Sequence, residues 1–409
     1  MDADVAFLEP ATWDRHIHAR MRWLREHAPV HWSRKDGCWV VSKFEDVAYV
    51  SKHQELFTSG QGVRGIDGPK IGLIDEAEPR HGRLRNLINK GFSPRMVKKL
   101  EVAFREITTE AIDAIAARGE ADFVEEVAVP LPLSLIAEMI GIRKQDRKKF
   151  HEWSDAMIRG DGNQGDPAIM AAAGQAFLAY SAYVRGIIED RRKHPQDDLV
   201  SILVGAKDAG VLTTFDQQQD RTGLGEDQVQ LANDELIMLL VILLVAGNET
   251  TRNAISGGMQ LLIEHPDERK KLIEDPGLIP SACEEMVRMV SPVQTFSRTV
   301  TEDTGLRGQR LRKGERVLML YPSANRDADA FDDPDTFRVE RNPVHLGFGL
   351  GPHFCLGANL ARMEMRVAFE ELLRRLPDME FADAEGAVIV PAALVRSCTR
   401  MRVRFTPEA

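Results

Sequence analysis

The chain has 409 residues, of which 43% are hydrophobic and 28% charged, and its net charge is −10. This composition is typical of a globular protein with a large core, and the acidic balance argues against a nucleic-acid-binding protein. Four cysteines are widely spaced without a CxxC pair, which disfavours a disulfide framework or a zinc site and favours a reducing, cytoplasmic compartment. They are Cys38, Cys283, Cys355 and Cys398.

The hydropathy pattern predicts no membrane anchor. Residues 1–20 lack an apolar core flanked by positive charge, so we expect no signal peptide either. The longest apolar run, residues 236–246, has eleven residues, whereas a helix needs about 20 apolar residues to span a bilayer.

The first half of the chain predicts a small β-rich part followed by helices. Strand or helix-edge signals occur at 39–42 and 47–50, within a β-rich part at about 25–70. From residue 75 to about 192 the hydrophobic pattern is helical.

Local signals mark helix ends and loops within this region. Ser93-Pro94 is a cap followed by proline and predicts a helix start. Another helix is expected within 122–140, closed by Gly141. Residues 160–166 predict a loop, and the polar stretch 204–230 predicts a surface excursion whose conformation the sequence does not define.

The second half predicts one long helix and then hairpins. Residues 234–264 form the helical stretch, which Pro266 stops. Residues 300–317 alternate between apolar and polar with glycines at the turns, as hairpins do. No linker divides the chain, so we expect a single domain over 1–409, with its helical bulk at about 75–409.

Cys355 is surrounded by glycines in the segment 348–362. Gly349, Gly351 and Gly357 allow the backbone to approach a flat ligand closely and to direct N–H groups toward the sulfur. The residues after Cys355 predict a helix start, whose positive end stabilises a thiolate. An anionic sulfur of this kind suits the ligation of iron. The alternative is a buried structural thiol, which the glycine spacing disfavours.

A second polar motif interrupts the long apolar helix. Gly247, Glu249, Thr250 and Thr251 follow the eleven-residue apolar run, and glycine and threonine there can loosen the helix and admit water. Glu249 and Thr250 would then form a proton-delivery pair, in which Thr250 holds water and Glu249 brings protons from outside. The alternative is a helix bend with a solvated glutamate.

The segment 348–362 resembles, in register, the haem-ligand loop of the cytochrome P450 family. Glu285 and Arg288 resemble the family's buried structural pair, and Arg341 matches the arginine that completes it. The resemblance covers about residues 75–376. It implies a mainly α triangular prism with small β regions, in which haem b lies between the 234–264 helix and the Cys355 loop with Cys355 as the iron ligand.

The same resemblance assigns further haem and substrate positions. Haem-binding positions besides Cys355 are His81, Arg85, Arg298, His353, Phe348 and Gly349, of which the first four are expected to hold the propionates. The substrate chamber is expected along the loop 60–71 and at Ile242, Val245, Ala246, Val293, Thr295 and Leu394. These apolar positions can equally belong to the core; as a pocket, they favour an apolar substrate.

The resemblance implies an O₂-dependent monooxygenase. Residues 246–255 look close to bacterial members that oxidise sterols, branched lipids or terpenoids. No flavin, dinucleotide or iron–sulfur motif is present, so a ferredoxin and its NAD(P)H-dependent reductase are the expected electron donors, docking at basic residues near Cys355 such as Arg83, Lys90 and Arg362. The alternatives are a peroxide-driven haem-thiolate enzyme and a non-catalytic haem or ligand-binding protein; the Glu249–Thr250 pair disfavours both.

Overall fold

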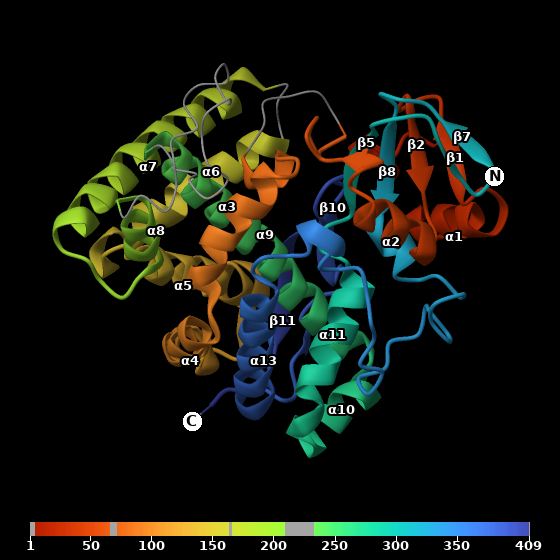
Figure 1. Ribbon diagram of the computed structural model, residues 1–409. Helices are drawn as coiled ribbons and strands as arrows, with labels where there is room; N and C mark the ends of the chain where they lie inside the picture. The colour runs from red at the N-terminus through yellow and green to blue at the C-terminus, as the bar shows by residue number, and fades with distance from the viewer. Residues whose placement is uncertain (1–4, 66–71, 163–165, 209–232, 409) are drawn as a thin grey trace.

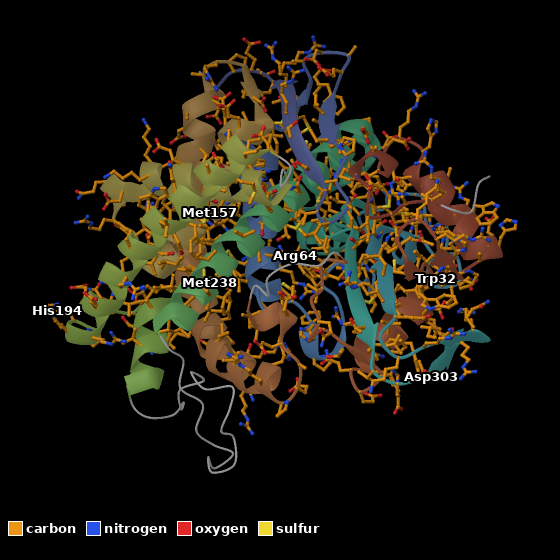
Figure 2. The ribbon with its side chains drawn as sticks, turned by 90° about the horizontal axis from the view of Figure 1, so that it is seen from above. Trp32, Arg64, Met157, His194, Met238 and Asp303 are labelled. Atoms are coloured by element: carbon orange, nitrogen blue, oxygen red, sulfur yellow. The ribbon has the colours of Figure 1, made fainter. Side chains whose placement is uncertain are left out.

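Helices fill most of the molecule, and a smaller β part lies beside them (Figure 1). The structure, a computed structural model, describes residues 5–65, 72–162, 166–208 and 233–408. Seen from above, Met157 and Met238 lie in the helical part, whereas Trp32 and Asp303 lie in the β part (Figure 2). The mainly α fold expected from the resemblance is therefore confirmed.

The helices are α1 (Ile17–His27), α2 (Phe44–Lys52), α3 (Arg80–Asn89), α4 (Pro94–Ala116), α5 (Pro130–Ile140), α6 (Arg147–Gly162), α7 (Pro167–Lys193), α8 (Leu199–Asp208), α9 (Asn233–Glu264), α10 (Pro266–Glu274), α11 (Ile279–Val290), α12 (Tyr321–Ala324) and α13 (Ala358–Arg375). The strands are β1 (Val30–Ser33), β2 (Cys38–Val41), β3 (Phe57–Thr58), β4 (Glu120–Asp122), β5 (Thr295–Val300), β6 (Thr304–Leu306), β7 (Gln309–Leu311), β8 (Arg316–Leu320), β9 (Glu380–Phe381), β10 (Ala387–Val390) and β11 (Ser397–Arg404).

Several helix ends follow the predicted local signals. The Ser93 hydroxyl accepts a hydrogen bond from the Met96 N–H and so caps α4. Gly141 adopts a left-handed conformation with φ of 80° directly after α5. Asp166, which was not predicted as a cap, accepts from two backbone N–H groups of the first turn of α7.

One predicted helix is confirmed, and two predicted loops are partly helical. The helix expected within 122–140 is α5, which begins at Pro130 and is closed by Gly141, whereas Asp122 pairs with β11 and a π-helical turn, Val124–Ala128, lies between them. The loop expected at 160–166 is helical to Gly162, and Gly160 allows α6 to pack closely on Ala173 of α7, where a Cβ at position 160 would lie 2.5 Å away.

The polar stretch 204–230 is also partly helical. Its first residues, 204–208, complete α8, whose apolar start is buried against the core. Residues 209–230 lie outside the described part of the chain, so that part of the expectation stays a prediction.

The main sheet joins strands from both halves of the sequence, in the order β1-β2-β8-β5-β3. β1 and β2 form an antiparallel hairpin, β2 runs parallel to β8, and β5 pairs antiparallel with both β8 and β3. The N-terminal β-rich part therefore needs β5 and β8 to complete its sheet. β6 and β7 form the predicted hairpin, and β10, β11 and β4 form a second sheet with β9 beside β11.

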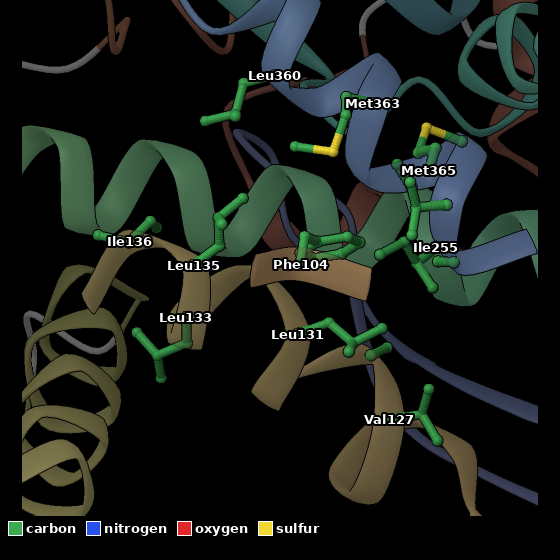
Figure 3. Close-up of a cluster of buried hydrophobic side chains, with 14 of the residues drawn as sticks. Phe104, Val127, Leu131, Leu133, Leu135, Ile136, Ile255, Leu360, Met363 and Met365 are labelled. Carbon is green, nitrogen blue, oxygen red and sulfur yellow. The ribbon is translucent and has the colours of Figure 1, made fainter. Parts of the chain in front are cut away.

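α9 is the central helix of the core. Figure 3 shows it between α13, which contributes Met363 and Met365, and α5, which contributes Leu135 and Ile136. Residues 236–264 are long and apolar enough to cross a membrane, but 56% of the most apolar window is buried inside the protein. A helix that is apolar around its circumference is the expected centre of a large core.

Candidate active site

The Cys355 loop is held in a fixed conformation by its own backbone. The Cys355 N–H donates to the Phe348 carbonyl at 2.8 Å, which closes the loop. Gly349 and Gly351 have φ angles of 68° and 73°, a region that favours glycine. A Cβ at Gly351 would lie 2.7 Å from the Ser51 carbonyl oxygen, so this glycine also allows the loop to pack on the end of α2.

The surroundings of the Cys355 sulfur partly stabilise a thiolate. The side chain is exposed by surface area, yet protein surrounds it closely enough that burial raises the pKa of the thiol. A backbone hydrogen bond from Gly357, at the start of α13, and the charges of Arg85 and Arg362 act in the opposite direction. The positive charge of a coordinated metal would add to these contributions, because it deprotonates a thiol outright.

His353 of this loop stacks on His81 of α3. The rings of His81 and His353 are 3.8 Å apart, with 29° between their planes. His81 Nδ1 lies 3.0 Å from Glu78, and His353 Nε2 lies 2.9 Å from the Ser59 hydroxyl. Burial, followed by the charge of Arg298, lowers the pKa of His353 to about 2. His353 is therefore neutral near pH 7 and acts as a hydrogen-bonding group rather than as a cation.

Two guanidinium groups near the histidines could bind an anionic group of a ligand. Arg298 is 3% exposed, its Nε has no hydrogen-bond partner, and it forms no ion pair with any described residue. Arg85 is half-buried and likewise lacks an ion pair within the described ranges. A buried guanidinium is costly without a compensating charge. The thiol and these cations therefore fit a haem, whose negative propionates Arg298 and Arg85 would hold.

Thr250 and Glu249 lie in an unbroken part of α9. The helix continues across Gly247, so the expected opening is not seen as a break. The Thr250 hydroxyl donates to the Ala246 carbonyl at 2.7 Å, which is the back-bond that threonine makes in helices. Ala246 is exposed and Thr250 half-buried, so this face of α9 is accessible.

The Glu249 carboxylate does not contact Thr250. It is 8% exposed, and its Oε1 lies 2.7 Å from Arg252 Nη2 in an ion pair without hydrogen-bond geometry. Its Oε2 accepts from the Asn253 amide at 3.3 Å. Burial raises the pKa of Glu249, Arg252 and Asn253 lower it, and the charge of Asp155 on α6 raises it. The two predicted members of the pair therefore have separate hydrogen-bond partners.

The predicted contact among Glu285, Arg288 and Arg341 is present. Arg288 donates to both carboxylate oxygens of Glu285, at 2.7 and 2.8 Å, and both residues are 0% exposed. Arg341 Nε donates to Glu285 at 3.0 Å. Arg288 also donates to the carbonyls of Asn325 and Pro334 and thereby fixes the irregular segment before the Cys355 loop.

The expected chamber residues on α9 are accessible. Ile242 and Val245 are half-buried, on the same helix as the exposed Ala246. Gly72 has a φ of 97°, and a Cβ there would lie 2.7 Å from the Ile242 side chain. The expected loop 60–71 lies outside the described part from residue 66 to residue 71.

The other chamber residues lie where two distant segments meet. Val293 forms an isolated bridge with Val395, and Gln294 N–H donates to the Leu394 carbonyl at 2.8 Å. Val293 and Leu394 are half-buried, whereas Thr295 is 1% exposed and donates to the Ala393 carbonyl. The hydroxyl of Thr295 is thus used to hold the segment that carries Leu394.

Sequence reasoning missed Ser59, Asn253 and Glu364. Asn253 follows Glu249 by four residues on one helix, a spacing that could have indicated the contact. Glu364 is an acid among apolar residues of α13, which could have marked it as buried. Ser59 comes from a segment that is remote in sequence, so no local signal predicts its contact with His353.

Glu364 gives a stability prediction. It is 3% exposed, the Thr251 hydroxyl lies 3.4 Å away as its only described hydrogen-bond partner, and burial raises its pKa from 4.5 to about 8. The neutral carboxyl of Glu364 therefore contributes its full stabilisation of the folded state below about pH 4.5, and this contribution is lost as the pH rises through about 8. The free energy of unfolding of Glu364→Gln, relative to that of the wild type, should increase by on the order of 4 kcal/mol between pH 5 and pH 8, since one pKa unit corresponds to about 1.4 kcal/mol.

Urea unfolding of both proteins at several pH values measures this difference. A stability difference that stays constant from about pH 5 to pH 8 would contradict the assignment of Glu364 as a buried neutral acid.

The fold and the site together define a protein that holds haem through a cysteine thiolate. The family model described as Cytochrome P450 matches residues 277–378, which include α11 and the Cys355 loop. The steroid C26-monooxygenase of Mycolicibacterium smegmatis is 36% identical over 389 residues, covering 95% of this chain and 92% of the relative. The chain belongs to the cytochrome P450 family and is a monooxygenase.

Other relatives support the same family. The methyl-branched lipid omega-hydroxylase of Mycobacterium tuberculosis is 39% identical over 360 residues, covering 84% of this chain and 79% of the relative. The crystal structure of CYP109E1 from Bacillus megaterium in complex with testosterone has a TM-score of 0.83 and 31% identity, and the match covers 95% of this chain and 99% of that one.

Proposed function

We propose that the enzyme hydroxylates a steroid or a methyl-branched lipid, with electrons from a ferredoxin system. One oxygen atom of O₂ enters a C–H bond and the other leaves as water, with two electrons and two protons consumed. When bound, the haem supplies the oxygen-activating chemistry. Cys355 would hold its iron, and Arg298, Arg85, His81 and His353 would hold its propionates.

The buried guanidinium of Arg298 carries the haem-binding part of this proposal, because it lacks an ion pair among the described residues. Phe348 and Gly349 would shape the loop beneath the ring. The accessible apolar side chains of Ile242, Val245 and Ala246 support an apolar substrate on the opposite side. The steroid and branched-lipid substrates are those in the names of the relatives. Both kinds of substrate are apolar.

Glu249 and Thr250 would deliver protons from outside. Because Thr250 and Glu249 have separate partners, a proton passes between them only through water or through a swing of the Glu249 side chain. The pKa of Glu249 is raised above its ordinary value, chiefly by burial, which favours its proton-carrying form.

The ferredoxin would bind near Cys355, at the surface where α4, α11 and α13 meet. A cavity of about 290 Å³ there is lined by Glu101, Glu284, Arg362 and Arg366, among others. Arg362 is 37% exposed, pairs with Glu284 at 2.7 Å and stacks over Phe348. Arg83 is half-buried, and the side chain of Lys90 is outside the described part.

We further propose that the chain forms one domain and acts in the cytoplasm. The main sheet combines strands from both halves of the chain, which supports a single folding unit. Its four cysteines are free in the structure, which fits a reducing compartment.

The decisive experiment compares two ways of driving turnover. A steroid with a branched side chain and a methyl-branched fatty acid are incubated with NADH, ferredoxin and reductase, or with hydrogen peroxide alone. We expect hydroxylated product chiefly with the ferredoxin system. Product from peroxide alone would favour the peroxide-driven alternative, and no product with either would favour a haem-binding protein without catalysis.

Thr250→Ala tests the proton-delivery role. The variant loses the hydroxyl that would order water at the haem face, so electrons should be diverted from product to hydrogen peroxide. General acid catalysis contributes about 10²–10⁴-fold, and we expect product per NADH to fall at least several-fold. Thr250→Ser retains the hydroxyl and is the matched control. Equal coupling in the alanine variant and the wild type would remove Thr250 from the mechanism.

A further inference from the structure

Asn253 makes three hydrogen bonds from a fully buried position on α9. Its amide nitrogen lies 2.8 Å from the Glu249 carbonyl and 3.3 Å from Glu249 Oε2. Its amide oxygen accepts from the Cys398 N–H of β11 at 2.8 Å. The side chain is 0% exposed, so each of these bonds is shielded from water.

The bond from β11 determines which way the amide of Asn253 faces. Because the backbone N–H of Cys398 can only donate, it requires the oxygen of the amide and turns the nitrogen toward Glu249. β11 follows the segment that includes Leu394, whose carbonyl accepts from Gln294. A strand attached to the expected chamber wall thereby orients the amide beside Glu249.

We infer that Asn253 is a positioning residue for Glu249, which holds the carboxylate in place and favours its ionised form by donating to it. The inference rests on the proposed proton-delivery role of Glu249. Arg252 holds the other carboxylate oxygen, so the two side chains together restrain both oxygens from one turn further along the helix.

The charged and titratable groups around Glu249 come from several elements. Arg252 lies on the same helix and lowers the pKa of Glu249. Asp155 lies on α6 and raises it. Glu364 of α13 faces Thr251, and the Cys398 thiol lies on β11. Of these neighbours, Asn253 is neutral and cannot titrate, so its removal changes hydrogen bonding at Glu249 without removing a charge.

Loss of the amide should move the ionisation of Glu249 in a defined direction. Without the donor, the ionised carboxylate loses stabilisation and the pKa of Glu249 rises further. Product formation that needs protonated Glu249 should then persist to higher pH. At the same time its maximum rate should fall, because the acid is weaker and less well oriented.

The test uses Asn253→Ala and Asn253→Asp in the haem-loaded enzyme. Asn253→Asp is nearly isosteric and can still accept from the Cys398 N–H, but an ionised carboxylate cannot donate to Glu249. We expect the alkaline limb of coupled turnover to move up by about one pH unit in Asn253→Ala and further in Asn253→Asp, whose added negative charge also raises the pKa of Glu249, with a roughly tenfold lower maximum rate in both. These magnitudes correspond to a hydrogen bond to a charged group.

An infrared titration gives a readout that does not depend on turnover. The carboxyl stretch of protonated Glu249 is identified by its loss in Glu249→Gln and is followed against pH in each variant. Cys398→Ala is the matched control, because it perturbs the same strand but keeps the backbone N–H. It should leave both the infrared titration and the alkaline limb unchanged.

The outcomes separate the inference from the function on which it rests. An unshifted infrared titration in both Asn253 variants would overturn the positioning role, whatever the activity. If Glu249→Gln retained the coupling and pH profile of the wild type, the proposed role of Glu249 in catalysis would fail, whereas a shifted titration would still support the contact. Altered haem loading with unchanged titration would show that Asn253 has only a structural role.

Discussion

Replacing Arg288 with methionine is expected to lower the free energy of unfolding by about 3–5 kcal/mol, the usual cost of breaking a buried ion pair from one side. Among the described residues, Glu285 would keep only Arg341 and the Arg338 N–H as partners, and its side chain is 0% exposed. The carbonyls of Asn325 and Pro334 would also lose their guanidinium donor. Because these carbonyls belong to the segment that leads to the Cys355 loop, haem retention should fall as well.

Urea unfolding and the haem content of the purified variant measure both effects. Lys270→Ala is the matched control. Lys270 and Glu274 also form an ion pair of a base and an acid, at 3.7 Å, but their side chains are 72% and 65% exposed. An exposed pair contributes at most about 1 kcal/mol. Similar stability losses in the two variants would show that Arg288 does not have the structural role inferred from its burial.

Replacing Cys355 with serine is expected to abolish monooxygenase turnover and the far-red-shifted Soret absorption of the reduced, carbon monoxide-bound protein. Serine presents no thiolate, so the electron donation to iron that a thiolate provides is lost. The loop itself should persist, because the bond from the backbone N–H at position 355 to the Phe348 carbonyl does not need the sulfur.

Difference spectra and product analysis measure this loss. Cys283→Ala is the control, because this thiol is fully buried in the core and burial raises its pKa well above the ordinary value. The control should keep the red-shifted absorption. A serine variant with the spectrum of the wild type would show that another residue ligates the iron.

Much of the site was predictable because its signals are local. The Cys355 loop needs glycines at fixed positions, and Gly349 and Gly351 have the positive φ angles that favour glycine, whereas Gly357 does not. Glu285 and Arg288 lie three residues apart on one helix, so their spacing already placed them on one face. Helix starts such as Ser93-Pro94 depend on side chains that bond to their own backbone.

Other features could not be derived from neighbouring residues. The sheet order depends on β2 pairing with β8, more than 270 positions away, and nothing local in 38–41 specifies that partner. Asp122 pairs with β11, a partner about 280 positions further along the chain that its neighbours do not specify. Likewise, Glu249 and Thr250 are adjacent in sequence, and this suggested a direct pair. Side chains at neighbouring helix positions point about 100° apart, however. In the structure the two side chains have separate hydrogen-bond partners.

The amino-acid sequence by itself determined the thiolate ligand, the family and the buried Glu285–Arg288 pair, since each depends on residue types at short, fixed spacings. Only the tertiary structure decided that Arg298 is buried without an ion pair to any described residue, that Glu364 is buried beside Thr251 and that Asn253 links β11 to Glu249. These properties depend on how much water and which polar groups remain around a side chain after distant segments have packed together.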